Sequence, residues 1–328
     1  MARPLDQAVV VVTGASSGIG RASALGFARR GAALVLCARS AGPLEEAAAE
    51  CRAAGAVGVL ARPLDVGDEA AVEALAAAAV ERFGRLDVWV NCAATMAYGP
   101  FTEIPSEVFR SIVETNLMGQ VHGARAALRR FHEQRTGVLI NVSSVWGRVS
   151  SPQVSPYVVS KNAVRALSEC IRGELAAEDG IEVVTIVPEA VDTPIFEHAG
   201  NYTGFHVRPI PPVIPAERVA EGIVDCAEEP RREVTFGRAG RLLEALYSFA
   251  PTVYRRFAHG AFVRGTMSSL PREPTAGNVL GPAAPHQVEG GWRGPRRPVL
   301  RRALLAALAA AAAGLLGSKS VTAPKPRR

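Results

Sequence analysis

The residues best suited to proton transfer are Tyr157 and Lys161, which stand four positions apart. In a helix, residues at that spacing lie on one face, so a phenol and an ammonium there can act together. A free tyrosine has a pKa of about 10, and a nearby cation favours the phenolate and lowers that pKa. Lys161 is also the sole lysine before Lys319 in an arginine-rich chain. We therefore predict a catalytic pair, and the alternative is a surface pair that arose by chance.

A glycine-rich turn, Thr13–Gly20, lies between an apolar run typical of a buried strand and an amphipathic stretch. Glycines let the backbone turn sharply and let phosphate oxygens approach, while the next helix presents free N–H groups and a positive dipole end. We predict that this turn binds the pyrophosphate of a dinucleotide, and a tight turn with chance glycines is the alternative. Its candidate cofactor contacts are Gly14, Ser16, Ser17, Gly18, Ile19 and Gly20.

The second apolar run ends at Ala38 and Arg39, at the place where a dinucleotide site selects its cofactor. A carboxylate at this strand end would bind the ribose 2′-hydroxyl of NAD, whereas a cation would pair with the 2′-phosphate of NADP. Ala38 takes the place of any acid, and Arg39 follows it directly. We predict that the chain prefers NADP(H) over NAD(H), and an ordinary surface arginine is the alternative.

Short apolar runs alternate with longer Ala-rich amphipathic stretches up to about residue 240. Such alternation is typical of βαβ units and predicts an α/β fold, a doubly wound parallel Rossmann sheet of about seven strands with helices on both faces. The predicted strands are Val9–Thr13, Ala33–Ala38, Val57–Ala61, Leu86–Asn91, Gly137–Ser143, Ile181–Val187 and Glu233–Phe236. The predicted helices span residues 18–31, 41–54, 68–83, 105–132 and 155–178. Residues 192–216 break the rhythm and predict a lid over the site, with some helix of its own.

The spacing Gly-x-x-x-Gly-x-Gly in the first turn, together with Tyr157-x-x-x-Lys161, resembles the short-chain dehydrogenase/reductase family in its non-extended form. The resemblance covers roughly residues 5–240, where five motifs occur in order at family-like spacing. It implies hydride transfer between a nicotinamide cofactor and an alcohol or carbonyl compound, in which the cofactor carries the hard chemistry.

The resemblance also implies two more catalytic residues. Ser144 would polarise the substrate oxygen, and Ser143 is the weaker alternative because neighbouring strand residues face opposite sides of a sheet. Asn116 would distort a long helix and hold a water that contacts the lysine, and a polar residue that bonds the helix backbone is the alternative. The implied catalytic residues are therefore Asn116, Ser144, Tyr157 and Lys161.

Further cofactor contacts follow from the resemblance alone. Besides Arg39, Tyr157 and Lys161, the implied set consists of Asp65, Val66, Asn91, Ala93, Pro188, Val191 and Thr193. Asp65 resembles the family's adenine contact, and a helix N-cap is the alternative. Cys92, Ala94 and Glu189 depart from the family's residues at their positions. The departure at Glu189 leaves open the conformation of the turn that would grip the nicotinamide carboxamide.

The function that the resemblance implies is an NADP(H)-dependent oxidoreductase that interconverts an alcohol and a ketone or aldehyde, with Tyr157 as acid and base. Apolar wall candidates favour a largely apolar substrate, which would contact Ser144, Trp146 and Tyr157. The wall candidates are Val145, Trp146, Met96, Tyr98, Phe101, Ile195, Phe196, Tyr202 and Phe205, with His198 and His206 as polar contacts. Ordinary packing, or for the histidines solvation, is the alternative for each. A non-catalytic dinucleotide-binding scaffold and a 3-oxoacyl-carrier reductase are the rival functions, and no metal-ligand spacing is present.

Beyond a catalytic domain of residues 1–240, we predict an extension, 241–298, and a tail, 299–328. Residues 240–264 predict an amphipathic helix that Pro251 breaks or kinks. Residues 271–298 are rich in Pro and Gly, which predicts an extended or poorly ordered segment. Ala303–Gly317 is apolar but short for a membrane span, so the tail predicts a peripheral membrane contact. A helix packed on a neighbour, or disorder, is the alternative for the tail.

The net charge of +6 arises at the C-terminus, because residues 290–328 hold nine Lys or Arg and no Asp or Glu. The remainder has no basic excess, so no nucleic-acid partner is expected. Five scattered cysteines and the lack of an apolar N-terminal signal favour a cytoplasmic protein. The family resemblance favours a homodimer or homotetramer, formed through the helices at 105–132 and 155–178.

Overall fold

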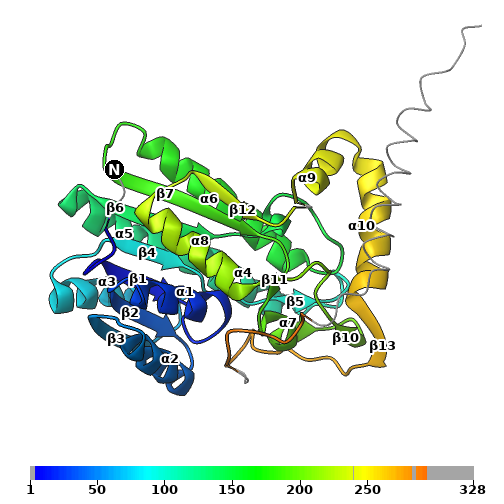
Figure 1. Ribbon diagram of the computed structural model, residues 1–328. Coiled ribbons are helices and arrows are strands. Elements are labelled where there is room, and N and C mark those ends of the chain that lie inside the picture. Colours follow the sequence, from blue (N-terminus) through cyan, green and yellow to red (C-terminus); the bar gives the residue numbers. More distant parts are fainter. Residues whose placement is uncertain (1–3, 239, 283–285, 294–328) are drawn as a thin grey trace, which may run out of the picture.

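The computed structural model describes residues 4–238, 240–282 and 286–293, and a parallel sheet forms its centre (Figure 1). Seven strands of the described residues make this sheet, in the order β12-β7-β6-β4-β1-β2-β3. The strands are β1 (Val9–Thr13), β2 (Ala33–Ala38), β3 (Gly58–Pro63), β4 (Val88–Asn91), β6 (Gly137–Val142), β7 (Ile181–Pro188) and β12 (Glu233–Phe236). All six pairings are parallel, so the carboxyl ends of the strands meet at one edge.

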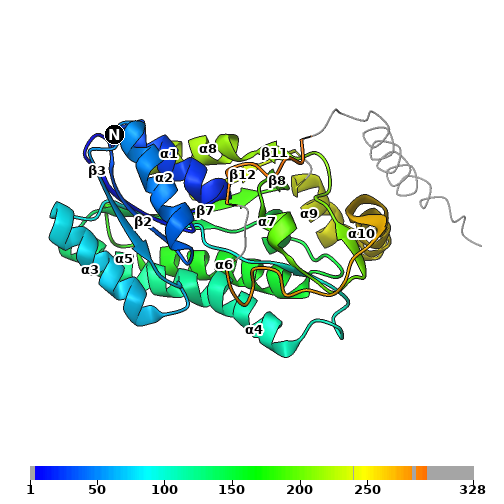
Figure 2. The same ribbon diagram turned by 90° about the horizontal axis from the view of Figure 1, so that it is seen from below.

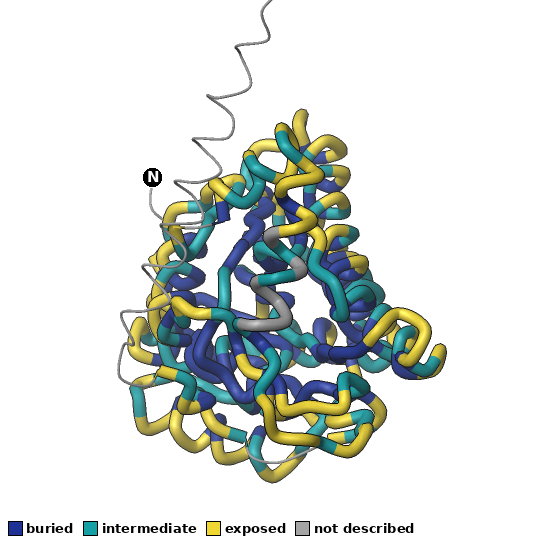
Figure 3. The backbone as a smooth tube through the Cα atoms, turned by 90° about the vertical axis from the view of Figure 1, so that its right-hand side faces the viewer, coloured by how far each residue is buried: buried dark blue, intermediate teal, exposed yellow. Residues whose placement is uncertain are grey.

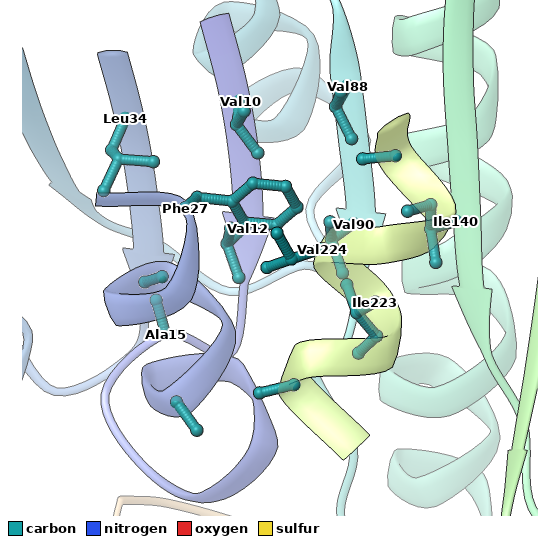
Figure 4. Packing of buried hydrophobic residues seen from close by; sticks show 14 of the residues in the cluster. Val10, Val12, Ala15, Phe27, Leu34, Val88, Val90, Ile140, Ile223 and Val224 are labelled. Atoms are coloured by element: carbon teal, nitrogen blue, oxygen red, sulfur yellow. The ribbon is translucent and has the colours of Figure 1, made fainter. Parts of the chain in front are cut away.

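Helices cover both faces of the sheet, as the alternating sequence pattern predicts. One face packs on α1 (Gly18–Ala28), α2 (Ala41–Ala53) and α8 (Ala216–Glu228). The other packs on α3 (Glu69–Phe83), α5 (Gly119–Gln134) and α6 (Ser155–Glu174). Because side chains alternate along a strand, Val10 and Val12 enter the first layer, whereas Val9 and Val11 enter the second. Figure 4 shows Phe27 of α1 and Ile223 of α8 packed against the first set.

The predicted helix over 105–132 is present and contains a distorted turn. It consists of α4 (Ser106–Val113), a π-helical turn, η1 (Glu114–Met118), and then α5. The extra residue of a π-helical turn shifts the register of the side chains that follow, and such turns occur often at functional sites. Asn116 lies inside the turn and is fully buried. The family resemblance implied a distortion at this residue, and the structure has one there.

Residues 192–216 form a small cap at the carboxyl edge of the sheet. Its elements are β8 (Val191–Asp192), the four-residue helix α7 (Ile195–His198), β9 (Gly200–Asn201), β10 (Phe205–Val207) and β11 (Ile214–Pro215). β9 pairs with β5 (Ala97–Tyr98), and β11 pairs with β8, so short bridges hold the cap to the body. The expectation of some helix in this segment is confirmed by α7.

After β12 the chain forms two helices, α9 (Gly240–Phe249) and α10 (Pro251–Thr266), and then β13 (Met267–Pro271). The break falls at Pro251, as the sequence predicts. The helices project from the sheet edge in Figure 1, and Figure 3 shows many exposed positions along them. β13 pairs antiparallel with β10. Polar contacts join the two helices to the body. They are the ion pairs of Glu244 with Arg148 and Arg165, the Gly240 N–H bond to Glu189, and the Tyr254 hydroxyl bond to the Ser150 carbonyl.

The expected tail contact, over residues 299–328 with the apolar run Ala303–Gly317, lies wholly outside the described residues. Among the residues that the structure describes, the search for a helix both long and apolar enough to cross a bilayer finds none.

Candidate active site

Tyr157, Lys161 and Ser144 meet at the carboxyl edge of the sheet. Ser144 follows β6 and comes just before the short 3₁₀ turn η2 (Val145–Gly147), while the other two lie on the first turns of α6. The Ser144 side chain hydrogen-bonds to Tyr157 and accepts the Trp146 N–H at 3.2 Å. The Lys161 ammonium lies 5.6 Å from the centre of the Tyr157 ring. A strand end and a helix start therefore bring a hydroxyl, a phenol and an ammonium to one place.

The two candidate serines have different surroundings. The Ser143 hydroxyl is buried and donates to the Lys161 carbonyl at 2.9 Å, which joins the end of β6 to α6. The Ser144 hydroxyl instead reaches Tyr157. The geometry supports Ser144 as the residue that would contact a substrate oxygen, because it shares the phenol's side of the pocket.

Burial controls the ionisation of the pair. It raises the pKa of Tyr157 above its ordinary value, and the Ser144 hydrogen bond acts in the opposite direction. Burial also lowers the pKa of Lys161 to about 8, against a smaller opposing effect of the Cys92 thiol. The net pKa of Tyr157 is therefore raised rather than lowered as the sequence predicts, because the cost of burying the phenolate outweighs what stabilises it. Lys161 Nζ donates to the Val142 carbonyl at 2.8 Å.

Asn116 ties three segments together. Its amide nitrogen donates to the Thr95 carbonyl at 2.9 Å and to the Ser160 hydroxyl at 3.1 Å, and its oxygen accepts the Thr95 N–H at 2.8 Å. Ser160 precedes Lys161 on α6, and Thr95 lies on the loop after β4. The alternative that Asn116 bonds the helix backbone is wrong, because its partners belong to a loop and another helix. It holds the π-helical turn, that loop and α6 in register.

The glycine-rich turn has the shape that a dinucleotide backbone requires. Gly14 and Gly18 have φ values of +69° and +53°, which side chains rarely adopt. A Cβ on Gly20 would lie 2.3 Å from the Gly14 carbonyl oxygen, so only glycine fits there. Ser17 precedes α1 without a side-chain cap, and the first N–H groups of a helix have no intrahelical acceptor. This cradle fits a pyrophosphate.

One pocket runs from the glycine turn to Tyr157. The predicted cofactor residues that line it are Gly14, Ser16, Ser17, Gly18, Ile19, Gly20, Arg39, Asp65, Val66, Ala93, Tyr157, Lys161, Pro188, Val191 and Thr193. Asp65 accepts the Gly67 N–H at 2.9 Å, and Asp68 is the residue that caps α3. The N-cap alternative for Asp65 is therefore wrong. Glu189 accepts the Gly240 N–H, so this departure from the family's residue attaches α9 to the sheet.

Asn91 is the predicted cofactor residue that is not among those lining the described pocket. Its amide nitrogen donates to the Gln120 carbonyl at 3.2 Å and to Asn141 Oδ1 at 2.9 Å, and its oxygen accepts the Trp89 indole N–H at 2.8 Å. Every polar atom of the side chain is thus paired inside the protein. Asn91 supports the end of β4, and the pocket itself meets the following residues.

The predicted walls divide into two groups. Those that line the pocket are Met96, Val145, Trp146, Ile195, Phe196 and His198, and Trp146 meets the Tyr157 ring edge-to-face at 5.9 Å. Five others are not among the described lining residues: Tyr98, Phe101, Tyr202, Phe205 and His206. Tyr98 is buried behind the pocket, and Tyr202 packs in a separate apolar cluster. Phe101 and Phe205 are exposed. The position of an aromatic residue near a motif in the sequence therefore does not show that its side chain forms part of the pocket wall.

Comparison with known proteins decides the family. The sequence model of the short chain dehydrogenases matches residues 8–202, more than half of the chain. The chain belongs to the short-chain dehydrogenase family. As an oxidoreductase of this family, it has the Rossmann-like sheet that its sequence predicts.

Relatives and solved structures support this assignment. An oxidoreductase of Bacillus subtilis (strain 168), YxnA, described as uncharacterized, is 32% identical over 328 residues that cover 95% of this chain and 91% of the relative. The bovine dehydrogenase/reductase SDR family member 7B is 37% identical over 191 residues, which cover 57% of this chain and 58% of the bovine protein.

Two solved structures share the fold. A short chain dehydrogenase/reductase from Burkholderia phymatum, in complex with NAD, has a TM-score of 0.69 at 28% identity over 76% of this chain and 96% of its own. An alcohol dehydrogenase from the archaeon Thermococcus sibiricus, complexed with 5-hydroxy-NADP, has a TM-score of 0.60 at 30% identity over 70% and 95%.

Sequence reasoning missed part of this dehydrogenase's pocket. Asn278, Pro282 and His286 line it from the C-terminal extension, and Leu243 lines it from α9. Residues 271–298 of the extension carry no family motif and no helical or strand periodicity. Their Pro and Gly content predicted only an extended path. No signal in the sequence could have placed these residues at the pocket.

Proposed function

We propose that this short-chain dehydrogenase is an NADP(H)-dependent oxidoreductase that interconverts an alcohol and a ketone or aldehyde of a largely apolar substrate. One observation carries the proposal: the glycine cradle and the group of Ser144, Tyr157 and Lys161 line the same pocket. A scaffold that only bound dinucleotides would need no proton donor at that position.

In the reductive direction, the Tyr157 hydroxyl donates its proton to the substrate's carbonyl oxygen. Ser144 donates a hydrogen bond to the same oxygen as negative charge develops on it. A bound nicotinamide supplies the hydride in this direction and accepts it in the other. Because burial raises the pKa of Tyr157, the phenol stays protonated and able to donate at neutral pH.

Lys161 supports the phenol by charge. Its ammonium lies close to the Tyr157 ring, and a cation there stabilises the phenolate that remains after proton transfer. Lys161 would also hold the ribose hydroxyls of the cofactor. Asn116 fixes the position of the helix that carries both residues, through Ser160.

Preference for NADP(H) over NAD(H) rests on the end of β2. Arg39 lines the pocket, and Ala38 supplies no carboxylate to bind a ribose 2′-hydroxyl. A guanidinium pairs well with a 2′-phosphate. One solved relative carries NAD and another carries 5-hydroxy-NADP, so the family accommodates both cofactors.

The pocket's walls support an apolar substrate. Trp146, Met96 and Phe196 line the end that contains Tyr157, and a few polar groups there would orient a carbonyl. A homodimer or homotetramer built through α5 and α6 belongs to the same proposal. Light scattering coupled to size-exclusion chromatography measures that assembly state.

The test is a panel of apolar ketones, aldehydes and secondary alcohols, assayed by the absorbance of the reduced nicotinamide with both cofactors. We expect turnover with NADPH or NADP and roughly 10²–10⁴-fold less turnover in Tyr157→Phe, with cofactor affinity retained. A Tyr247→Phe variant, on exposed α9, is the matched control and should keep full activity. Equal activity of Tyr157→Phe and the wild type would contradict the proposal.

A further inference from the structure

A belt of residues, 272–282 and 286–293, lies beyond the part of the chain that matches the family. It leaves β13 and passes back towards α7 and β11, as the orange segment shows in Figure 2. Short hydrogen bonds fix its first part to the cap: the Thr275 and Asn201 backbones bond each other at 2.7 and 3.0 Å, and the Asn278 N–H donates to the His198 carbonyl at 2.8 Å. The belt is thus packed against the body from its start.

At one end of the pocket, the belt contacts the residue proposed to select the cofactor. Arg39 donates to the carbonyl oxygens of Asn278 and Val279, at 2.5 and 3.3 Å. Val279 is fully buried, and its carbonyl also accepts the Ser111 hydroxyl at 3.0 Å. The belt therefore determines where the Arg39 guanidinium is held.

At the middle of the pocket, the belt meets the glycine turn itself. The Gly18 N–H donates to the Gln287 carbonyl at 3.0 Å, and Arg21 Nη1 donates to the His286 carbonyl at 2.8 Å. Gly18 opens α1, so the belt shares the helix start that would hold a pyrophosphate. The His286 ring lines the pocket, and its Nδ1 is buried with no hydrogen-bond partner among the described residues.

At the nicotinamide end, a single carboxylate fastens the belt. Asp192 is 1% exposed and accepts the Gly290 N–H at 3.0 Å, the Trp292 N–H at 2.9 Å and Arg293 Nε at 3.1 Å. The Trp292 indole N–H donates to the Thr193 carbonyl at 3.2 Å, and its ring meets Phe196 edge-to-face.

The fit at this end depends on close backbone approach. A Cβ on Gly290 would lie 2.4 Å from the Thr193 carbonyl oxygen. Thr193 itself lines the pocket. At this end the belt therefore packs behind Thr193, while Asn278, Pro282 and His286 are the described belt residues that line the pocket itself.

We propose that the belt is the outer wall of the dinucleotide site and that Asp192 is the positioning residue that keeps it closed over the bound cofactor. This inference rests on the proposed function, because it takes the pocket's ligand to be NADP(H). A dinucleotide lying between the glycine turn and Thr193 can leave only when the belt moves. Breaking the contacts of Asp192 therefore speeds release, while the catalytic residues stay in place.

The experiment measures the dissociation rate of NADPH from the full chain, followed by nucleotide fluorescence after mixing with excess NADP. We expect Arg293→Ala and Gly290→Ala each to release NADPH roughly tenfold faster, because a charge-assisted bond or a close backbone contact is lost. Arg293→Lys keeps the positive charge beside Asp192 and should stay near the wild-type rate. Arg232→Ala removes an exposed ion pair with Glu169 and should change nothing.

Arg293 and Gly290 are substituted instead of Asp192 because replacing this buried carboxylate would leave its buried N–H partners without an acceptor and could unfold the protein. Faster release of NADPH in both variants, with wild-type rates in Arg293→Lys and Arg232→Ala, would support the proposal that Asp192 keeps the belt closed over the cofactor. Wild-type release rates in Arg293→Ala and Gly290→Ala would overturn it. If the wild type bound neither NADPH nor NADH, the proposed function would fail first, and that result is distinct from binding with unchanged release.

Discussion

The catalytic edge and the belt reach the same pocket by different means. At the catalytic edge, defined by Ser144, Tyr157 and Lys161, side chains contact one another, so the residue types themselves carry the site. In the belt, backbone carbonyls contact the residues that line the cleft: that of Asn278 accepts from Arg39, and that of Gln287 accepts from Gly18. Every residue has the same backbone carbonyl, whatever its side chain. The catalytic edge can therefore be predicted from residue types in the sequence, whereas the contacts of the belt cannot.

The two regions also differ in how they are supported. The catalytic edge stands on a strand end and a helix that share the central core. The belt and the helices before it depend on a few polar contacts, of which the Arg148 ion pairs and the Asp192 hydrogen bonds are buried. Removing one group should thus damage chemistry at the first region and attachment or cofactor exchange at the second.

After Tyr157→Phe, the largest expected effect at the catalytic edge is that of Lys161→Met. This change keeps much of the side-chain volume but removes the charge that stabilises the phenolate. We expect kcat/KM to fall roughly 10²–10³-fold, since general acid–base catalysis typically contributes that much. Steady-state assays with the best substrate of the panel measure it, and Arg125→Ala, at an exposed ion pair, is the control. A loss of less than about threefold would break the distinction between the two regions.

The same lysine predicts a pH dependence. Burial lowers its pKa to about 8, so Lys161 carries its charge below that pH and loses it as the pH rises further. Tyr157 stays protonated over this range because burial raises its pKa. The wild-type kcat/KM for carbonyl reduction should therefore fall about tenfold per pH unit above pH ~8. Lys161→Met should show no such fall, and a parallel decline in that variant would assign the titration to another group.

The next largest effect concerns how firmly α9 is attached to the sheet edge. Arg148 is buried, pairs with Glu233 and Glu244, and also donates to Thr235, so it links α9 to the sheet edge. Arg148→Ala leaves partly buried carboxylates with fewer partners, and we expect the free energy of unfolding to drop by about 3 kcal/mol. Chemical denaturation measures it. A change no larger than that of the exposed Arg52→Ala would show that the network contributes little.

The smallest effect concerns Arg39, which the belt contacts at the end of the pocket away from the catalytic edge. Arg39→Ala should reduce the ratio of kcat/KM for NADPH to that for NADH by roughly tenfold, because one charge-assisted contact to a 2′-phosphate is lost. Assays with both cofactors give the ratio directly. Since the belt carbonyls also hold Arg39, Arg39→Lys tests whether charge alone suffices. An unchanged ratio in Arg39→Ala would contradict the proposal that Arg39 gives the enzyme its preference for NADP(H).

Periodicity explains how much of the fold could be predicted. Val9–Thr13, Ala33–Ala38 and Glu233–Phe236 are strands at the predicted bounds, because each is an apolar or β-branched run fixed by its place in the sheet. The helix over 105–132 is present, and the distortion at Asn116 was implied only by the family resemblance, not by periodicity. A π-helical turn there depends on the partners of Asn116, which lie far away in the sequence.

The candidate site was predictable where spacing alone brings residues together. Tyr157 and Lys161 share a helix face, and the glycines share a turn, so both motifs line the pocket. The pairing of the Asn91 side chain could not be predicted, because its partners, Gln120 and Asn141, come from other elements. The pKa of Tyr157 was misjudged because burial depends on the folded surroundings and not on the four-residue spacing.

The most direct test of the central claim uses NADPH that carries deuterium at the transferable position, together with a carbonyl substrate from the panel. The account predicts that the wild type forms an alcohol with one deuterium on the former carbonyl carbon, seen by mass spectrometry. Tyr157→Phe should bind NADPH as tightly as the wild type yet form almost none of this product. Labelled alcohol formed by Tyr157→Phe at the wild-type rate would contradict the account.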